Sequence, residues 1–528
     1  MIMSVYLIGM AISFVVYIVI GLFVSRSVKS ANDYYVAGRN ATVLLIVGSM
    51  IASYVSTGMF MGDAGEGYSG FMGPLIIVAT MQVVGYILGA VLVGRYLRRS
   101  EVLTLPQFFG KRFNSHAMKV LATITAVITM CVYLLSVTMG IGTLMSTVTG
   151  LDYKLCVALG VVVFTIVTIT SGSKGVLITD TLMFSIFTSA LLITVFTIIG
   201  KAGGWRNIIV ILNADGKSDY VSWGGVKGYL YPDSGTTIVW TIINGILWMS
   251  VCMVGPWQSS RYLMARNEHT VIRSSIFSAF GIFMLQLLTF IAAVSVNAYH
   301  PELDSPSHVL IWASMNILPT VLGVIMLTGV LAAGISSGTT FLSLIGSSVA
   351  NDIFDGRGNS IRNGHIAMYI TAVIVMLLGM FNPPQIFWIM YMGGAIIASS
   401  WMPVALASVL SKRVTKAGAF WGMLVGFAVC FIMKLVGSLT GITYPVYLDP
   451  TFVGIVANLI AMIIATAMTN VTPEEKEARE RMLVVPESEK DPKEVKKTER
   501  YLIAAIGLGA VVTLVLIFLW ALPVMSAR

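Results

Sequence analysis

A ten-residue stretch, LAAGISSGTT, stands inside an apolar segment that is long enough to cross a bilayer. A membrane-spanning helix already satisfies its own backbone, so these extra oxygens either pack against another helix or hold something polar. Residues three and four apart share a helix face, so Ala333, Ser336 and Ser337 form one cluster. Ser336, Thr339 and Thr340 form a second cluster on the same helix. Because hard cations prefer oxygen ligands, the stretch is compatible with ion binding as well as with close packing.

Asp180 is the acidic residue that the sequence places most clearly inside a span, within SGSKGVLITDTLMF. A carboxylate inside a membrane costs about 2.5–3.5 kcal/mol on insertion scales, so it is a functional candidate. At 1.5 Å per residue, Asp180 and the hydroxyls of 336–340 both fall in the half of the membrane predicted to be cytoplasmic. The two features can therefore meet. The alternative is a capping or interfacial role for Asp180 beside Lys174.

The composition indicates a protein whose apolar surface is embedded in a membrane. Of the 528 residues, 57% are hydrophobic and 11% are charged, which predicts an all-α polytopic membrane protein. About fourteen transmembrane helices are expected over the following approximate ranges: 5–25, 41–63, 73–97, 118–148, 155–173, 177–200, 236–257, 273–298, 318–349, 364–381, 386–409, 417–437, 451–470 and 501–523. Residues 1–528 thus form a single membrane transport domain, whose charged segment 471–500 is expected to be a solvated linker with a short helix.

Lys and Arg residues concentrate in alternate loops, beginning with the loop after the first span. The positive-inside rule then places 26–40, 98–117, 258–272 and 471–500 in the cytoplasm and both termini outside. The net charge of +9 is a topology signal and does not indicate nucleic-acid binding. No phosphate-binding GxxxxGK[ST] motif or metal-ligand cluster occurs in the sequence, so neither ATP-driven pumping nor metal chemistry is supported.

Two predicted spans look interrupted. The second contains IASYVSTGMFMG, with small and hydroxyl residues crowded between Ala52 and Gly58, and the seventh ends at Gly255 and Pro256. Spans 2–6 and 7–11 give two halves of five helices, which have opposite topology because five is odd. Interrupted helices at matching places in two inverted halves point to a transporter binding site near the midplane.

In this order and spacing, several motifs together resemble the sodium:solute symporter family. They are SANDYYVAGRN after the first span, the polar second span, SGSKGVLITDTLMF, PWQSSRYLM, LAAGISSGTT and FNPPQIFWIMYMGG. The resemblance covers nearly the whole chain. It implies a five-plus-five inverted-repeat core of the leucine-transporter type over about 41–200 and 236–409, with flanking helices that include the last one at 501–523.

The resemblance also implies site residues. A shared sodium site would use the residues Ala52, Val55, Ala333, Ser336 and Ser337. A second sodium site, found in only some members, would use Asp180, Ser336, Thr339 and Thr340. The candidates for lining the solute pocket are Tyr54, Ser56, Thr57, Met59, Gln82, Tyr133, Trp248, Trp257, Trp388 and Tyr391.

The solute is constrained less tightly. The chain lacks the arginine that sialic acid carriers have in span 4, and it has Met59 where sugar carriers tend to have an amide. A small acid or amino acid is favoured, with its carboxylate against the exposed amides of broken helices. The other possibility is a quaternary amine such as choline, boxed by Trp248, Trp257 and Tyr133.

The sequence therefore predicts a sodium-coupled symporter that imports a monocarboxylate, an amino acid or a pantothenate-like acid by alternating access. A non-transporting sensor or a channel on the same fold is the alternative. No enzyme activity and no cofactor are expected, with Na⁺ as the coupling ion. The expected partners are the solute, Na⁺ and the lipid bilayer, with no nucleic acid and no obligatory protein partner. The expected location is the plasma membrane.

Overall fold

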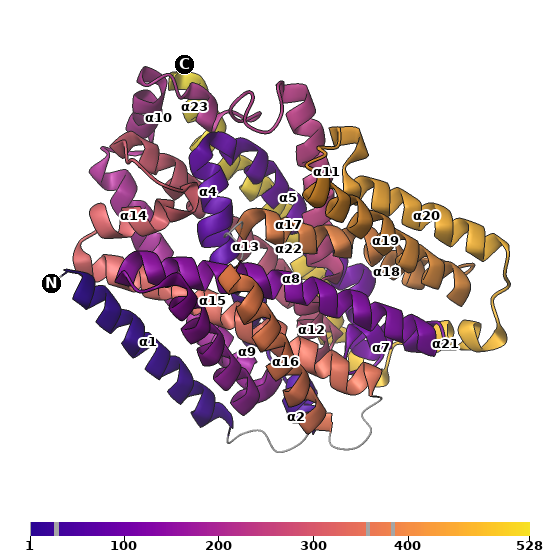
Figure 1. Ribbon diagram of the computed structural model, residues 1–528. Coiled ribbons are helices and arrows are strands. Elements are labelled where there is room, and N and C mark those ends of the chain that lie inside the picture. Colours follow the sequence, from indigo (N-terminus) through magenta and orange to yellow (C-terminus); the bar gives the residue numbers. More distant parts are fainter. Residues whose placement is uncertain (1, 26–30, 355–359, 382–385, 528) are drawn as a thin grey trace.

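The computed structural model describes residues 2–25, 31–354, 360–381 and 386–527, and it is a bundle of helices (Figure 1). Thirteen helices in this part of the chain are long and apolar enough to cross a membrane. Among the described residues there is one isolated β-bridge, between Ala41 and Ala265, and no strand. The predicted all-α polytopic class is confirmed. Arg26 and Lys29, which contributed to the predicted orientation, lie outside the described residues.

The count of thirteen differs from the predicted fourteen because of one broken helix. The predicted second span, 41–63, begins with the helix α3 (Val43–Tyr54), whose 12 residues are too few to cross alone. After the break, a 42-residue helical tract, Gly58–Arg99, contains the rest of that span together with the third. This tract bends at Gly70, whose φ of 96° is easily adopted only by glycine.

The first half of the predicted core consists of α3 and the elements that follow it. Their bounds are η2 (Gly58–Asp63), α4 (Ala64–Glu66), η3 (Gly67–Phe71), α5 (Met72–Gly89), η4 (Ala90–Gly94), α6 (Arg95–Arg99), α7 (Leu105–Arg112), α8 (His116–Thr149) and α9 (Tyr153–Lys201). Helix α9 is kinked at Gly172 (φ 55°, ψ −169°), which separates the predicted fifth and sixth spans.

The second half begins after the loop that carries α10 (Trp205–Ala214). Its elements are α11 (Ser234–Val254), α12 (Pro256–Met264), α13 (Glu268–Ser295), η6 (Val296–Tyr299), η7 (Pro306–His308), α14 (Val309–Asn316), α15 (Thr320–Ser348), η8 (Val349–Ile353), α16 (Ser360–Phe381), α17 (Ile386–Ser400) and α18 (Met402–Leu410). Pro256 occupies the first turn of α12, where its missing N–H costs nothing, and Gly255 before it is extended (ψ 135°). The predicted interruption of the seventh span is therefore present.

The remaining helices flank these two halves. They are α1 (Ile2–Ser25), α2 (Ala31–Val36), α19 (Lys416–Thr440), α20 (Pro450–Ala467), α21 (Pro473–Leu483), α22 (Pro492–Leu516) and α23 (Leu522–Ala527). Short turns complete the list: η1 (Ala37–Arg39), η5 (Ser218–Val221), η9 (Val446–Leu448), η10 (Glu487–Glu489) and η11 (Ile517–Ala521). In Figure 1 the C-terminus and α23 lie beside α10, so the chain ends on the same side as the loop 201–235.

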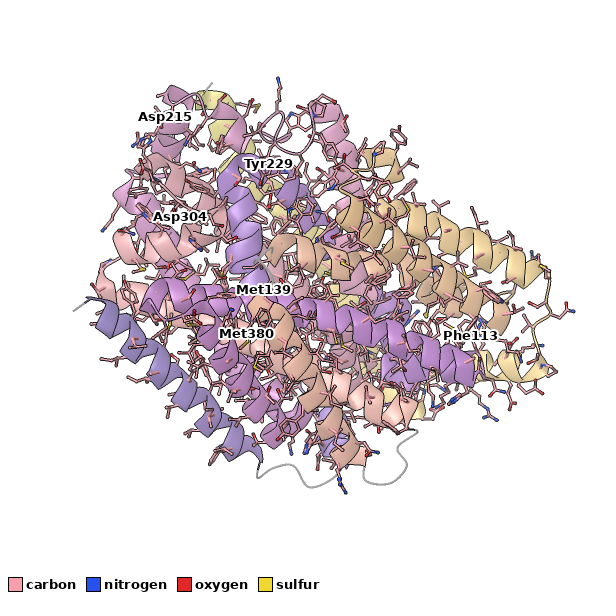
Figure 2. All side chains as sticks on the ribbon, viewed as in Figure 1. Phe113, Met139, Asp215, Tyr229, Asp304 and Met380 are labelled. Carbon is pink, nitrogen blue, oxygen red and sulfur yellow. The ribbon has the colours of Figure 1, made fainter. Side chains whose placement is uncertain are left out.

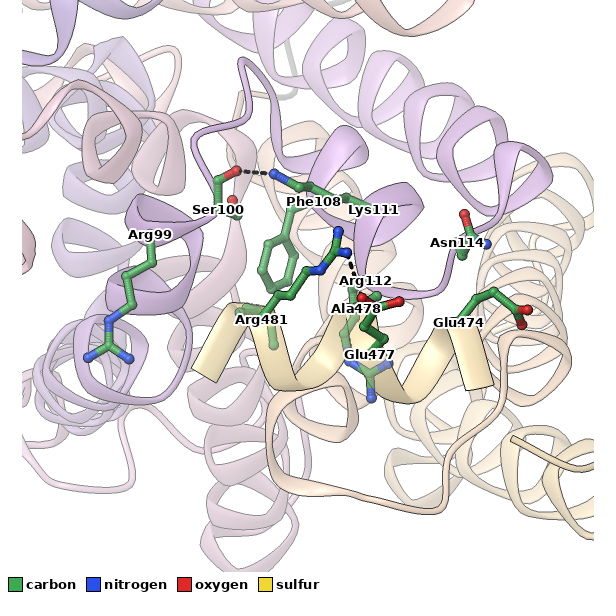
Figure 3. A pocket seen from close by; sticks show the side chains of 11 residues that line it. Arg99, Ser100, Phe108, Lys111, Arg112, Asn114, Glu474, Glu477, Ala478 and Arg481 are labelled. Carbon is green, nitrogen blue, oxygen red and sulfur yellow. Dashed lines mark hydrogen bonds and ion pairs between the residues drawn. The ribbon is translucent and has the colours of Figure 1, made fainter. Parts of the chain in front are cut away.

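Side chains fill the space between the helices (Figure 2). Asp215 and Tyr229 lie towards one end of the molecule, and Phe113 lies towards the other. At the Phe113 end, α21 runs beside α7 (Figure 3), and Arg112 donates to the Glu475 carbonyl (3.4 Å). The capping box of Thr472 and Glu475 starts α21, which is the short helix expected in the charged linker.

One predicted loop is wrong. Residues 258–272 were expected in a cytoplasmic loop, but α12 continues through Met264 and α13 begins at Glu268. Hydropathy alone ended the seventh span early because α12 contains the charged Arg261, which is almost fully buried and neutralised by a partner on another helix.

Candidate functional site

The break in α3 lies against the hydroxyl-rich face of α15. Helix α3 ends at Tyr54, Val55 is extended (φ −72°, ψ 110°), and helical structure resumes at Gly58. Ser336 Oγ lies 3.3 Å from the Ala52 carbonyl oxygen, and Ser337 Oγ donates to the same oxygen (3.5 Å). The early end of α3 interrupts the regular ladder in which the Ala52 carbonyl would bond to the amide four residues on. This oxygen is consequently available to a partner outside the helix.

The five residues expected at the shared sodium site are all inaccessible to solvent: Ala52, Val55, Ala333, Ser336 and Ser337. Two hydroxyls and one carbonyl oxygen converge there, and Ala333 lies one turn earlier on α15. This donor set suits a hard monovalent cation, because each oxygen offers lone pairs and no soft ligand is present among them. An ion at this place would bind the broken helix to α15.

Two glycines allow the broken segment to sit deep between helices. A Cβ on Gly140 of α8 would lie 2.4 Å from the Thr57 side chain, and a Cβ on Gly334 of α15 would lie 2.9 Å from it. The Thr57 hydroxyl also donates to the Val137 carbonyl of α8 (3.2 Å). Thr57 is therefore a packing anchor of the break on α8 and α15.

Asp180 is fully buried in α9, which rules out an interfacial capping or snorkelling role. Its carboxylate accepts hydrogen bonds from Ser336 Oγ (2.6 Å) and Ser49 Oγ (2.6 Å), and it pairs with Arg261 Nη2 (2.9 Å). Three helices, α3, α12 and α15, thus supply partners to one carboxylate. Such full satisfaction is what a buried charge needs in order to be tolerated.

Arg261 of α12 is a functional candidate that sequence reasoning missed. Its Nη2 donates to Thr340 Oγ1 (2.8 Å) and its Nε to Ser49 Oγ (2.9 Å), in addition to its pairing with Asp180. Its Nη1 donates to the Trp257 carbonyl (3.0 Å). The available signal was an arginine two residues after the QS of PWQSSR, next to a helix break, but its partner lies 81 positions away.

The four residues of the second predicted sodium set are only partly brought together. Asp180 and Thr340 bond directly to the Arg261 guanidinium, and Ser336 bonds to the Asp180 carboxylate. The Thr339 hydroxyl instead donates to the Ser336 carbonyl of its own helix (2.8 Å). A positive side chain therefore stands among the groups that were expected to hold a second ion.

A small cavity lies next to the break in α3. Only about 10 Å³ of it is open to a water-sized molecule in this structure, and its lining residues are Ser53, Tyr54, Ser56, Met59, Asp63, Tyr133, Trp248, Trp257, Phe341 and Met390. Six of the ten predicted solute-pocket residues are among them: Tyr54, Ser56, Met59, Tyr133, Trp248 and Trp257. The rings form a continuous aromatic wall, with ring centroids 4.4 Å apart for Tyr133 and Trp257 and 6.0 Å apart for Tyr54 and Trp248.

The other four predicted pocket residues lie off this cavity. Thr57 anchors the break, as described, and Gln82 is buried on α5. Trp388 is 39% exposed and lines a separate groove with Glu66 and Tyr229. Tyr391 donates to Asp449 Oδ2 (2.9 Å).

Asp63 is the second residue that the sequence did not single out, because it falls at the end of the predicted second span. Its side chain lines the cavity, although it is 93% buried (7% exposed). The cavity therefore combines an aromatic wall with one carboxylate.

Comparison with known proteins gives a consistent result. Residues 34–426 match the family model described as the sodium:solute symporter family. The sodium/proline symporter of Escherichia coli (strain K12) is 22% identical over 459 residues, which cover 81% of this chain and 88% of that one. The osmoregulated proline transporter OpuE of Bacillus subtilis (strain 168) is 25% identical over 491 residues, covering 88% and 94%.

Two solved structures have a similar fold. A Na⁺-coupled sialic acid symporter in a substrate-bound, outward-open state has a TM-score of 0.73 at 15% identity, with 89% of this chain and 98% of that chain covered. Mhp1, a nucleobase-cation-symport-1 family transporter, has a TM-score of 0.52 at 14% identity, with 86% and 99% covered. At these identities the likeness concerns the fold alone.

Proposed function

The chain belongs to the sodium:solute symporter family, and on that premise we propose that it imports a small organic solute, driven by Na⁺ bound between the broken helix α3 and α15. It is thus a multi-pass membrane transporter that uses Na⁺ as its coupling ion, and it is not an enzyme. The single observation that carries the proposed ion site is the convergence of the Ser336 and Ser337 hydroxyls on the Ala52 carbonyl.

The proposed ion ligands are the carbonyls of Ala52, Val55 and Ala333 with the hydroxyls of Ser336 and Ser337. When Na⁺ binds, both serine hydroxyls turn lone pairs to the ion and give up their contacts with the Ala52 carbonyl, while the Ser336 proton remains hydrogen-bonded to Asp180. The ion then replaces the contacts with the Ala52 carbonyl by stronger ones between α3 and α15. Because the solute cavity adjoins the same break, sodium favours the arrangement that binds solute.

At the second predicted sodium site, we propose that Arg261 provides the positive charge in place of a second sodium ion. Its guanidinium already bonds to Asp180 and Thr340. A sodium ion at the same place would sit beside a fixed cation and would have to displace it. One Na⁺ per solute is the stoichiometry that this arrangement supports.

The proposed solute is a small organic acid, with amino acids among the candidates, in line with the proline transport of two relatives. Its carboxylate would lie at the break, where Ser56 borders the cavity and the following amides point along the helical tract. The aromatic wall of Tyr133, Trp248 and Trp257 keeps the quaternary amine as the second candidate, since such rings attract a cation.

We also propose the plasma membrane as its location, with both termini outside. The C-terminal helix α23 contacts α10, which lies in the loop 201–235. Six predicted spans precede this loop, so it lies on the same side as the N-terminus. The distribution of Lys and Arg supports the same orientation.

Transport by the purified protein in proteoliposomes tests this function. With an inward Na⁺ gradient, uptake of a screened acid or amino acid should exceed its uptake in a matched K⁺ gradient, and the solute should increase sodium binding measured by calorimetry. A channel or a sensor on this fold would show no solute-stimulated sodium binding, and that result would reject the symport mechanism.

A further inference from the structure

Asp63 stands in the aromatic cavity without a cationic partner. Among the described residues, no Lys, Arg or His forms an ion pair with its carboxylate. This contrasts with Asp180, whose charge is matched by Arg261. A buried carboxylate that lacks a fixed counter-charge is costly, unless a cation or a hydrogen-bond donor arrives from elsewhere.

The Asp63 side chain has the Gln286 side chain as a hydrogen-bonding neighbour, but no charged partner in the part of the chain that the structure describes. Gln286 lies next to Asp63, and its Nε2 donates to the Tyr54 hydroxyl (3.1 Å), whereas its Oε1 has no partner. The buried Tyr133 hydroxyl, on the cavity wall, has no partner either. Unpaired buried polar groups are unfavourable. The Gln286 oxygen can only accept, so it favours a ligand that brings an N–H donor, whereas the Tyr133 hydroxyl can donate or accept.

We propose that Asp63 binds a primary or secondary ammonium group of the transported solute, with the faces of Tyr133 and Trp248 beside that group. This proposal rests on the function proposed above and makes the substrate class more specific. The aromatic wall alone would accept a quaternary amine, but a quaternary nitrogen has no N–H to give to the carboxylate or to the unpaired oxygens. A plain monocarboxylate would place a second negative charge in the cavity beside Asp63.

Among the solute classes left open, an amino acid with a free amine therefore fits best. Its carboxylate would lie near Ser56 and its ammonium at Asp63, both of which line the cavity. Because only about 10 Å³ is open to a water-sized molecule in this structure, the lining residues must move apart to admit the solute.

Matched triads of compounds test the assignment in detergent-purified full-length protein. Each triad shares one skeleton: L-proline, cyclopentanecarboxylate and N,N-dimethylproline form the first, and L-alanine, propionate and N,N,N-trimethylalanine form the second. Binding is measured by calorimetry and by thermal shift, with and without Na⁺. We expect the free-amine member of at least one triad to bind at least about tenfold more tightly than the other two members, the difference expected for a charge-assisted contact.

Two variants test whether the preference for the free amine comes from Asp63. Asp63→Asn should remove at least about tenfold of the preference for the amine, while the affinity for Na⁺ alone stays within about twofold. Glu66→Gln removes the same charge three residues further on, in the groove that contains Tyr229, and it should keep the wild-type preference.

The outcomes separate the two proposals. Loss of sodium binding in the wild-type protein would reject the proposed function itself. Normal sodium binding with equal or tighter binding of the deaminated or quaternary compounds, or with no binding of either free amine, would overturn the role of Asp63 alone. An Asp63→Asn protein that binds the amine normally would overturn it as well.

Discussion

At the scale of single residues, the pairing of Asp180 with Arg261 determines how the centre of the molecule tolerates charge. Both side chains are almost completely buried, and the hydroxyls of Ser49, Ser336 and Thr340 complete their hydrogen bonding. Removing one partner leaves an uncompensated charge, whereas removing both does not. The pair is therefore expected to behave as a unit.

A double-mutant cycle measures this coupling. Asp180→Asn and Arg261→Met should each destabilise the protein by about 3–5 kcal/mol, and the double variant should lose less than the sum of the two. Thermal unfolding in detergent is the measurement, provided that it is reversible. Additive losses would mean that the two charges are independent.

The position of Asp180 inside an apolar span singled out this carboxylate, but not its partner. Helix spacing shows which hydroxyls of 336–340 share a face, because that relationship is local. The contact between Asp180 and Arg261 joins positions 81 apart, through the packing of α9 and α12, and no local pattern encodes it. Asp63 was overlooked for a related reason: hydropathy placed it at the edge of a span, whereas the helical tract continues beyond it.

At the scale of elements, the two broken helices were predictable because their causes are local. Gly255 and Pro256 separate α11 from α12, and a run of small and hydroxyl residues accompanies the break after Tyr54. The sequence could not show what packs against the break after Tyr54, since Gly140 and Gly334 come from helices far along the chain.

Gly140→Ala and Gly334→Ala test whether this packing holds the break in place. Each added methyl would clash with Thr57, at a cost of about 1–3 kcal/mol if the helices cannot shift. Because Ala52 lies three residues before Val55, where the break begins, we expect weaker Na⁺ binding and slower uptake. Gly507→Ala on α22 is the control, since nothing lies within 4 Å of its added Cβ. Unchanged sodium affinity in both core variants would show that the break does not depend on this contact.

At the scale of the whole molecule, the number of ions moved per solute sets how strongly the solute can be accumulated. The membrane potential contributes about 2.3 kcal/mol per 100 mV for each net charge that crosses. With Arg261 as the cation beside Asp180, one Na⁺ should accompany each zwitterionic solute, which makes one net positive charge per cycle.

Reversal potentials of reconstituted protein give this ratio directly. We expect one charge per zwitterionic solute in the wild-type protein, and the same ratio in any Asp180→Asn protein that still transports. Two charges per solute, falling to one in Asp180→Asn, would instead establish a second sodium ion at Asp180, Ser336, Thr339 and Thr340.

The sodium dependence of uptake tests the site between α3 and α15 most directly. In proteoliposomes, Ser336→Ala and Ser337→Ala should each raise the Na⁺ concentration for half-maximal uptake by about five- to thirtyfold, because each removes one oxygen ligand. Thr328→Ala, on the same helix but with its hydroxyl bonded to the Ile325 carbonyl, should leave that concentration unchanged. Wild-type sodium dependence in both serine variants would contradict the assignment of the coupling ion to this site.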